Sequence, residues 1–479
     1  MLLQGLVILH TLAVIIFSIR ILLRDNLSSA ARLAWFMVML FAPYVGVVLY
    51  LLFGEISVGR TVRRRHDQIF AKLSSIAASS MGSCEHNLEG NIEIEYQTAF
   101  RAASVDGFGT TLGNKAELLA DAATTRSRLI EDIDNATESV QCLYYIWLDD
   151  NTGRSVAEAL IRAAKRGLAV YAMADGLGSR KFVRSKYWRE MRDAGVKLAV
   201  ALPMKWVIDT ILFSRLDLRN HRKITVIDGC ITWCGSQNCA DAEFLVKAKY
   251  APWIDIMLRL KGPVVAQNQL LFVSDWLLNS GEAAPESFAV KAKEIEGGFP
   301  AQIFADGPTN RRGATPQLFA TLLTLAKQEV VISTPYFVPN STVLDAICAA
   351  AVRAIDVTMI FPKRNDSWIV AAASHGYYRR LLEHGVKIYE FRDGLLHSKT
   401  FTIDRGLSLI GSSNLDLRSF DLNYENDILL RDDEVTQLIY QRQQEYIAQS
   451  DPVTLEHVNA WTYPRRIWNN VVATIGPIL

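Results

Sequence analysis

A stretch that occurs twice constrains the fold of this chain more than any other feature. The first copy, NHRKITVIDGCITWCGSQN, begins at Asn220, and the second, LHSKTFTIDRGLSLIGSSN, begins at Leu396. Both fit the template H-x-K-x4-D-x6-G-S-x-N, and so many fixed positions at identical spacing indicate an internal duplication. The matched residues are His221, Lys223, Asp228, Gly235, Ser236 and Asn238 in the first copy and His397, Lys399, Asp404, Gly411, Ser412 and Asn414 in the second.

Helical and strand-like segments alternate in the same order ahead of each copy. In the first half, apolar periodicity predicts helices over 117–136, 155–166 and 186–194, and strands over 139–147, 168–174 and 196–201. In the second half it predicts helices over 315–328, 343–353 and 374–384, and strands over 330–336, 356–361 and 386–389. The pattern predicts an α/β protein with two duplicated halves, 116–295 and 296–450.

The two halves differ in length just before the motif. Gly195 to His221 spans 26 positions, whereas Gly385 to His397 spans 12. The extra residues lie within MKWVIDTILFSRLDLRN and are rich in large apolar side chains. They predict either additional core, such as a packing helix, or a flap that touches lipid.

Two apolar runs, 2–23 and 33–53, open the chain, and each is about long enough to cross a hydrocarbon core as a helix. A cleaved signal peptide is the alternative for the first run, but that run lacks a small-x-small cleavage site. Arg20, Arg24 and Arg32 are outnumbered by the cations that follow the second run, between Arg60 and Lys72. This charge bias predicts a transmembrane hairpin over 1–60, with the rest of the chain in the cytoplasm.

The segments that flank the two halves carry weaker signals. Residues 61–115 turn to Ser, Ala, Asn and Gly, which predicts a juxtamembrane connector with one strand over Glu93–Phe100. The end of the chain, YPRRIWNNVVATIGPIL, sets cations and Trp468 beside apolar residues. We therefore expect 451–479 to be a membrane-surface tail.

Charge and cysteine content exclude other classes of protein. The formal net charge is +1, without the basic stripe that a nucleic-acid-binding protein carries. Cys230, Cys234 and Cys239 lie close together, but their spacing matches no zinc site. The sequence thus predicts neither a nucleic-acid partner nor a metal site.

The residue types of the motif point to phosphodiester chemistry. His and Lys two positions apart on a strand share one face, so His221 projects with Lys223, and His397 with Lys399. Lys ammonium, Asn amide and Ser hydroxyl groups donate hydrogen bonds to phosphate oxygens, which makes Ser236, Asn238, Ser412 and Asn414 candidate substrate-binding residues. One imidazole can attack phosphorus while the other protonates the leaving oxygen. Two lysines can neutralise the developing charge, so we expect no metal or other cofactor.

The acidic residues near the motif divide into two pairs. Asp228 and Asp404 belong to the motif, but they face away from the histidines on an ideal strand and precede a turn, which predicts a structural role. A catalytic histidine also requires a carboxylate on its other nitrogen to fix its tautomer. Asp255 and Glu425 occupy matching places after the two motifs and are the candidates, unless they are strand-end acids in surface ion pairs.

The duplicated motif resembles that of the phospholipase D superfamily, and the whole chain is similar to its bacterial cardiolipin synthase branch. The supporting stretches are YVGVVLYLLFG, YYIWLDDNTG, STPYFVPN, HGVKIYEF and GSSNLDLRSFDLNYEN. The resemblance implies a phosphatidyltransferase of the bacterial inner membrane whose lipid partners are phosphatidylglycerol and other anionic phospholipids. It implies that the catalytic set is His221, Lys223, Asp228, His397, Lys399 and Asp404.

By the same resemblance His221 is expected to attack phosphorus, with His397 as acid and base. Glycerol leaves from one phosphatidylglycerol, and a second phosphatidylglycerol then attacks. The alternatives are hydrolysis or headgroup exchange on the same scaffold and, less favoured, a nuclease. Tyr145 and Tyr336 are either pocket-lining or core aromatics, while Arg219 and Arg418 either meet a second lipid phosphate or form surface ion pairs.

Overall fold

The computed structural model describes residues 2–24, 27, 29–54, 63–69, 71, 73, 92–105, 107–203, 217–280 and 291–474. These residues form two compact units. One comprises Met1–Val62 with Met204–Asp217, and the other comprises Arg63–Pro203 with Leu218–Pro477. The apolar insertion at 204–216 lies outside the described residues, so neither of its two interpretations is tested.

The N-terminal unit consists of one helix of 21 residues and three shorter helical segments, with a small core of its own. Its elements are α1 (Leu2–Leu22), α2 (Ser29–Phe41), α3 (Pro43–Leu49) and the π-helical turn η1 (Tyr50–Gly54). Ile21, Met39 and Tyr50 form the buried cluster, and many of the other large apolar side chains are exposed. Among the described helices, none combines the length and the apolar character needed to cross a membrane. The hairpin therefore stays a prediction.

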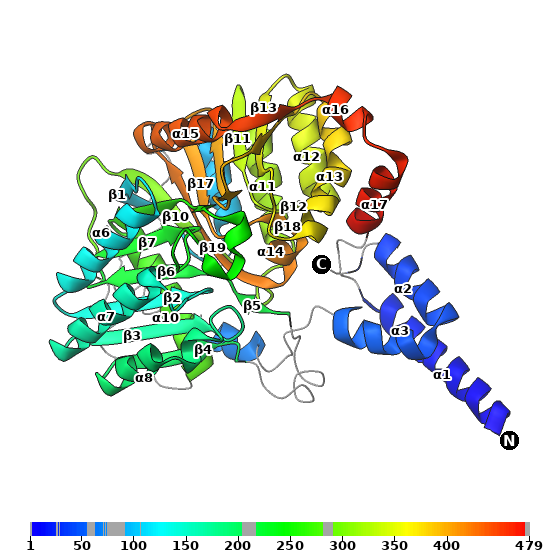
Figure 1. The fold of residues 1–479 in the computed structure, drawn as a ribbon, viewed down its shortest axis with the longest axis horizontal. Coiled ribbons are helices and arrows are strands. Elements are labelled where there is room, and N and C mark those ends of the chain that lie inside the picture. The colour runs from blue at the N-terminus through cyan, green and yellow to red at the C-terminus, as the bar shows by residue number, and fades with distance from the viewer. Residues whose placement is uncertain are drawn as a thin grey trace. The chain divides into compact units, whose positions relative to one another are not determined.

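One continuous sheet runs through the larger unit and joins its two halves (Figure 1). Seven strands come from the first half: β1 (Thr111–Leu118), β2 (Ser139–Tyr144), β3 (Ala169–Asp175), β4 (Lys197–Ala201), β6 (Lys223–Ile227), β7 (Ile231–Gly235) and β9 (Met257–Lys261). The second half supplies β10 (Phe299–Asp306), β11 (Glu329–Ser333), β13 (Asp356–Pro362), β14 (Lys387–Phe391), β16 (Thr400–Ile403), β17 (Leu407–Gly411), β19 (Asn423–Arg431) and β20 (Ser450–Val453).

The order of these strands shows the duplication directly. From one edge the sheet runs β4-β3-β2-β6-β7-β9-β1, and it continues as β10-β19-β17-β16-β11-β13-β14-β20. The second series mirrors the first, with β20 added at the far edge. The seam is the antiparallel pair β1–β10, where Thr111 lies opposite Ala301. The predicted α/β fold with two duplicated halves is confirmed.

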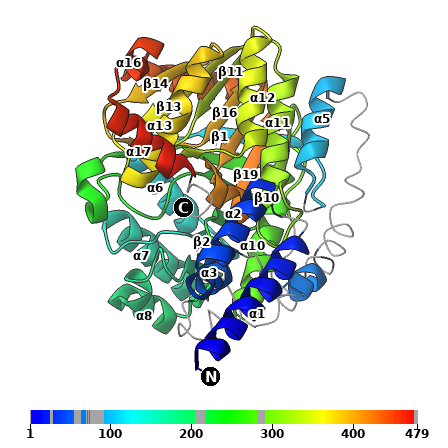
Figure 2. The same cartoon turned by 90° about the vertical axis from the view of Figure 1, so that its right-hand side faces the viewer.

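Helices cover both faces of the sheet in each half, as the two views show (Figures 1 and 2). Alternate strand residues face opposite cores, because successive side chains of a strand point to opposite faces. In β2, Val140 and Cys142 pack with α6 (Ala122–Asp134) and α7 (Asn151–Lys165), whereas Leu143 packs on the side of α10 (Val264–Ser280). The core on the α10 side also contains Ile428 and Ile439 of the second half, so the halves share one interior.

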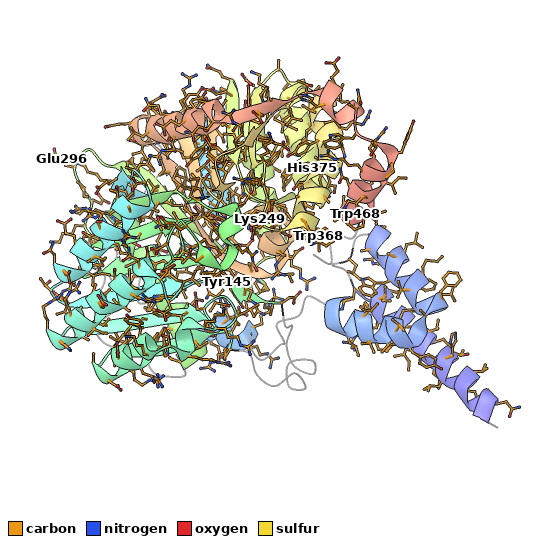
Figure 3. The ribbon with its side chains drawn as sticks, viewed as in Figure 1. Tyr145, Lys249, Glu296, Trp368, His375 and Trp468 are labelled. Carbon is orange, nitrogen blue, oxygen red and sulfur yellow. The ribbon has the colours of Figure 1, made fainter. Side chains whose placement is uncertain are left out.

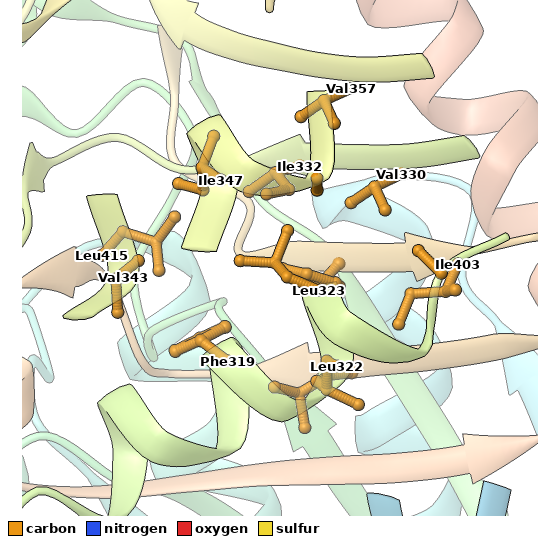
Figure 4. Close-up of a cluster of buried hydrophobic side chains, with 14 of the residues drawn as sticks. Phe319, Leu322, Leu323, Val330, Ile332, Val343, Ile347, Val357, Ile403 and Leu415 are labelled. Atoms are coloured by element: carbon orange, nitrogen blue, oxygen red, sulfur yellow. The ribbon is translucent and has the colours of Figure 1, made fainter. Parts of the chain in front are cut away.

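The second half repeats this layering. Helices α11 (Ala314–Leu325) and α12 (Ser341–Val352) pack on one face of its strands, and Figure 4 shows the apolar side chains that they bury there. Helix α15 (Asp433–Ala448) contacts strands β11, β16 and β17, as α10 contacts β6 and β7 in the first half. Helix α13 (Trp368–Glu383) packs against α17 (Tyr463–Thr474).

Most predicted elements are present, and the differences have local causes. The strand predicted over Glu93–Phe100 is wrong, because this segment forms helix α5 (Ile94–Ala103), which buries Ala99, Phe100 and Ala103 at helical spacing. The helix predicted from Glu117 begins only at Ala122, after Asp121 has capped its N-terminus and β1 has ended at Leu118.

The C-terminal segment contains two short helices after β20, α16 (Leu455–Asn459) and α17. Helix α17 buries Asn469 and Val472 and leaves Tyr463, Ile467, Trp468 and Val471 exposed. Trp468 stacks on Trp368 at the start of α13, with ring centroids 5.7 Å apart (Figure 3). The membrane-surface role of 451–479 is not tested by these contacts and stays a prediction.

Candidate active site

Each motif histidine follows a very short strand that pairs with the other half of the protein. The strand β5 (Arg219–Asn220) pairs in parallel with β19, and β15 (Leu395–Leu396) pairs with β8 (Trp253–Ile254). The backbone N–H of His221 donates to Tyr424 O at 2.9 Å, and that of His397 donates to Ile254 O at 2.8 Å. Both histidines are thus positioned by the backbone of the opposite half.

Each histidine also contacts a carboxylate that belongs to the opposite half. His221 Nδ1 lies 2.8 Å from Glu425 Oε2, and His397 Nδ1 lies 2.6 Å from Asp255 Oδ1. The sequence places each acid after the histidine of its own half. In the structure Asp255 precedes β9 and Glu425 lies in β19. These two strands flank the central β1–β10 pair, and each carboxylate contacts the histidine of the opposite half. The side chain of Glu425 is fully buried and that of Asp255 is 8% exposed, so both are enclosed partners of the histidines and not surface acids.

The motif serines hold these carboxylates. Ser236 Oγ donates to Asp255 Oδ1 at 2.6 Å, and Ser412 Oγ donates to Glu425 Oε2 at 2.5 Å. Both serines are fully buried. Glu425 also accepts hydrogen bonds from Ser419 Oγ and Asn423 Nδ2. The two serine hydroxyls predicted to bind substrate are thus engaged with the acids, and their predicted contact with phosphate is not tested.

Two buried lysines lie beneath the histidines. Lys223 Nζ donates to His221 O at 2.5 Å, and Lys399 Nζ donates to His397 O at 2.6 Å. Burial lowers the pKa of Lys223 to about 8 and that of Lys399 to about 7, although neighbouring carboxylates partly oppose the effect. An anionic phosphate bound nearby favours the charged form of both lysines.

The two histidines open onto one cleft of about 330 Å³. The motif asparagines Asn238 and Asn414 also line it, whereas the serines do not. Tyr145 contacts the His221 ring edge-on, with centroids 4.9 Å apart, and the Trp253 ring lies 4.6 Å from that of His397. The remaining sequence candidates, Tyr336, Arg219 and Arg418, line the cleft as well.

The electrostatics of the site favour neutral imidazoles. Burial lowers the pKa of His221 to about 4 and lowers that of His397. Burial alone would raise the pKa of Asp255, but the charges of His397 and Lys399 hold it at about 2. An ionised carboxylate accepts the Nδ1–H of its histidine, so Nε2 carries the lone pair. Each ring is therefore in the tautomer that a nucleophile or general base requires.

Asp228 and Asp404 lie away from this centre. Each has a positive φ, 52° and 48°, at the turn after its motif strand. The carboxylate of Asp228 accepts hydrogen bonds from the backbone N–H groups of Thr137, Glu138 and Ser139, and that of Asp404 from Lys327, Gln328 and Glu329. Each Asp thus ties its turn to the start of β2 or β11. Neither carboxylate is directed at the histidines, although both belong to the catalytic set that the resemblance implies.

The shifted pKa of His221 predicts loss of stability in mild acid. Its ordinary pKa is 6.5 and its folded value is about 4, so below pH 6.5 the unfolded chain binds a proton that the folded protein does not. We expect the thermal midpoint to fall as the pH drops from 6.5 toward 4. A thermal-unfolding series across this range measures the effect. The slope becomes shallower in His221→Gln, and an unchanged slope in that variant would contradict the assignment.

Sequence reasoning missed several residues that complete the site. Trp253 packs on His397, and Asn423 and Ser419 hold Glu425. Asp366 bridges the halves, because it accepts from Tyr336 of its own half and pairs with Lys247 of the other. With Asp255 matched to Glu425, Asn423 corresponds to Trp253 in the first half. The two residues are of different types, so the duplication gave no signal for either of them.

Two α/β halves that share one sheet and direct paired H-x-K motifs into a common cleft define a phospholipase D-like protein. The family model described as "Cardiolipin synthase, PLD-like domain" matches residues 129–267 and 319–446. A second model, "Phospholipase_D-nuclease N-terminal", matches residues 12–55. The chain belongs to the cardiolipin synthase family, which confirms the resemblance seen in its motifs.

Individual relatives agree with this assignment. The chain is 35% identical over 472 residues to cardiolipin synthase A of Yersinia pseudotuberculosis, covering 96% of this chain and 95% of the relative. The values for cardiolipin synthase A of Yersinia pestis bv. Antiqua (strain Angola) are the same. The crystal structure of phosphatidylserine synthase from Haemophilus influenzae superposes with a TM-score of 0.60 over 81% of this chain and 100% of that chain. At 16% identity this likeness concerns the fold alone.

Proposed function

We propose that this protein is a cardiolipin synthase that transfers a phosphatidyl group from one phosphatidylglycerol to another and releases glycerol. The observation that carries the proposal is the pair of histidine–carboxylate contacts, each built from both halves and facing one cleft. Such a centre splits one displacement at phosphorus into two through a covalent intermediate. The family of the chain supports phospholipids as the substrates.

In the first displacement, Nε2 of one histidine attacks phosphorus and the bond from phosphorus to the glycerol oxygen breaks. The second histidine gives its proton to the departing glycerol. In the second displacement, a hydroxyl of another phosphatidylglycerol attacks phosphorus, the bond from phosphorus to nitrogen breaks, and the hydroxyl proton returns to the second histidine. Lys223 and Lys399 oppose the negative charge that builds up on the phosphoryl oxygens.

We assign the attack to His221 and the proton transfers to His397, as the resemblance implies. Burial lowers the pKa of both histidines, so either imidazole can be the unprotonated nucleophile and the assignment rests on the resemblance alone. The general acid must instead carry a proton when the substrate arrives. Binding of an anionic phosphate beside His397 favours its protonated form.

The product formed from phosphatidylglycerol alone tests the proposal. We expect purified full-length protein to convert it into cardiolipin and free glycerol in equal amounts. Lipid products resolved by mass spectrometry, with glycerol assayed enzymatically, give both quantities. Phosphatidic acid as the main product would identify a hydrolase and exclude the proposed transfer. Cleavage of a nucleic-acid diester at a comparable rate would favour the nuclease alternative.

We further propose that the N-terminal segment anchors the protein in the bacterial inner membrane as a hairpin, with the catalytic unit in the cytoplasm. The apolar runs, the cations after the second run and the match of 12–55 to an N-terminal family model support this placement. A C-terminal fusion to a reporter that is active only in the cytoplasm is expected to be active. Activity of the matched periplasm-only reporter would reverse the orientation.

A further inference from the structure

The C-terminal helix α17 directs its large apolar side chains to solvent. Its inner face packs on α13, where Val472 joins Ala372 and Ala373 in a small core and the polar residue Asn469 is also buried. The outward face carries large side chains at helical spacing, each between 46% and 78% exposed, namely Tyr463, Ile467, Trp468 and Val471. A helix on the surface of a soluble protein normally directs its polar residues to water, so the polarity of α17 is inverted.

This exposed apolar face continues from α17 to the mouth of the cleft. Trp468 stacks on Trp368, the first residue of α13, and both rings stay exposed (Figure 3). Asp366, two residues before Trp368, lines the cleft and pairs with Lys247 of the other half. Val246, next to Lys247, lines the cleft as well and is exposed. A chain of contacts therefore joins the outward face of α17 to the cleft.

The 3₁₀ segment η3 (Leu245–Tyr250), which contains Lys247, lies in a connection that is longer in one half than in the other. Between the motif asparagine and the paired acid the chain spans 17 positions in the first half, Asn238 to Asp255, and 11 positions in the second half, Asn414 to Glu425. The longer connection places two apolar side chains, those of Leu245 and Val246, in solvent at the mouth of the cleft. Such side chains are suited to contact with an apolar phase.

The same segments are cationic. Helix α17, η3 and residues 363–368 contain one acidic residue, Asp366, whose side chain is 4% exposed and is paired with Lys247. Their cations are Lys247, Lys249, Lys363, Arg364, Arg465 and Arg466. Tryptophan, tyrosine and cations around exposed apolar side chains are the composition of a segment that lies in the interface of a membrane with anionic lipids. A lipid surface therefore fits this face better than a protein partner, which would need no such charge.

We infer that α17, Trp368 and η3 form a docking surface for a bilayer that contains anionic phospholipid, and that this surface opens the cleft toward the bilayer. The inference rests on the proposed function, which supplies lipid as the substrate. The apolar side chains enter the boundary of the acyl chains, the aromatic rings lie among the headgroups, and the cations meet lipid phosphates. Phosphatidylglycerol then passes from the bilayer into the cleft without crossing water.

A fluorescent label on the outward face of α17 tests the contact directly. In full-length protein with Cys84→Ser and Cys230→Ser the remaining cysteines are buried, so Val471→Cys provides one labelling site. In vesicles of phosphatidylcholine and phosphatidylglycerol, nitrobenzoxadiazole at this site is expected to emit at shorter wavelength and to be quenched by doxyl-labelled lipid. Leu438→Cys, at a 44% exposed position in α15, is the matched control, and its label stays in water. A label at position 471 that stays in water, or one that is shielded but not quenched by the lipid, would overturn the docking surface.

Activity on two forms of phosphatidylglycerol separates docking from catalysis. The double variant Ile467→Ser, Val471→Ser changes two exposed side chains that do not line the cleft. Its kcat/KM is expected to fall roughly tenfold with long-chain lipid in vesicles, because two apolar side chains no longer enter the bilayer. With dihexanoyl phosphatidylglycerol dissolved in water, the variant is expected to keep the wild-type value. Leu438→Ser is the matched control and keeps both values.

The contrary outcomes are distinct from failure of the proposed function. No loss with vesicles, or an equal loss with both forms of the lipid, would overturn the docking surface. Consumption of phosphatidylglycerol is the quantity measured, so the comparison holds for a protein that forms cardiolipin and for one that forms phosphatidic acid. The proposed function fails separately, if phosphatidic acid is the main product of the wild-type protein.

Discussion

His221→Ala and His397→Ala are each expected to reduce cardiolipin formation by at least about 10³-fold, because every turnover uses one imidazole to hold the phosphatidyl group and the other to move a proton. No neighbouring side chain can take over either role. The side chains next to the two rings are a tyrosine, a tryptophan and the paired carboxylates, none of which occupies the position of Nε2.

The two variants are also expected to differ in what they accumulate. Under rapid quenching, the protein lacking the attacking histidine forms no phosphorylated intermediate, whereas the other variant forms it slowly and retains it. Digestion and mass spectrometry of the quenched protein locate the modified peptide, which we expect to contain His221. A modified peptide that contains His397 instead would exchange the two roles. His457→Ala, at an exposed residue outside the cleft, is the matched control and keeps wild-type turnover. Full activity in either motif variant would refute the two-histidine mechanism.

Sequence reasoning went furthest for the part of the site that lies within one half. A His and a Lys two positions apart on a strand share a face, and in the structure Lys223 and Lys399 each donate to the backbone oxygen of their own histidine, although both histidines precede the strands β6 and β16. The prediction that Asp228 and Asp404 have a structural role rested on the same alternation, and both carboxylates bind the start of a neighbouring strand. The most prominent acids of the motif are directed away from the histidines.

What the sequence could not supply was the relation between the halves. A repeated sequence does not indicate how its two copies pair. In this protein they meet through the antiparallel β1–β10 pair, and this arrangement places Glu425 beside His221 and Asp255 beside His397. Segment 93–100 shows a second kind of limit. Its alternating Glu and Ile residues have strand periodicity, but the apolar side chains at Ala99, Phe100 and Ala103 find a buried face only as a helix. In both cases tertiary contacts decide the outcome.

Each histidine is paired with the acid of the opposite half, and removing the charge of either acid is the second change for which we expect a large loss of activity. Glu425→Gln and Asp255→Asn are each expected to lower kcat by roughly 10²- to 10⁴-fold while the protein stays folded, because the amide keeps the shape of the side chain but no longer stabilises the imidazolium or fixes its tautomer. Glu434→Gln, at an exposed position in the first turn of α15, is the matched control and keeps its activity.

The pKa of each histidine reports which acid it depends on. The charge of Glu425 raises the pKa of His221 against the effect of burial, and Asp255 does the same for His397. Glu425→Gln is therefore expected to lower the pKa of His221 and leave that of His397 nearly unchanged, and Asp255→Asn to do the reverse. Histidine-selective ¹⁵N labelling and NMR titration of the full-length protein measure both values. If each variant instead perturbs the histidine of its own half, the contacts across the seam are not those of the working enzyme. If the predicted pattern holds, neither half contains a complete histidine–carboxylate pair, and the duplicated sequence forms one catalytic centre only when its two parts share a sheet.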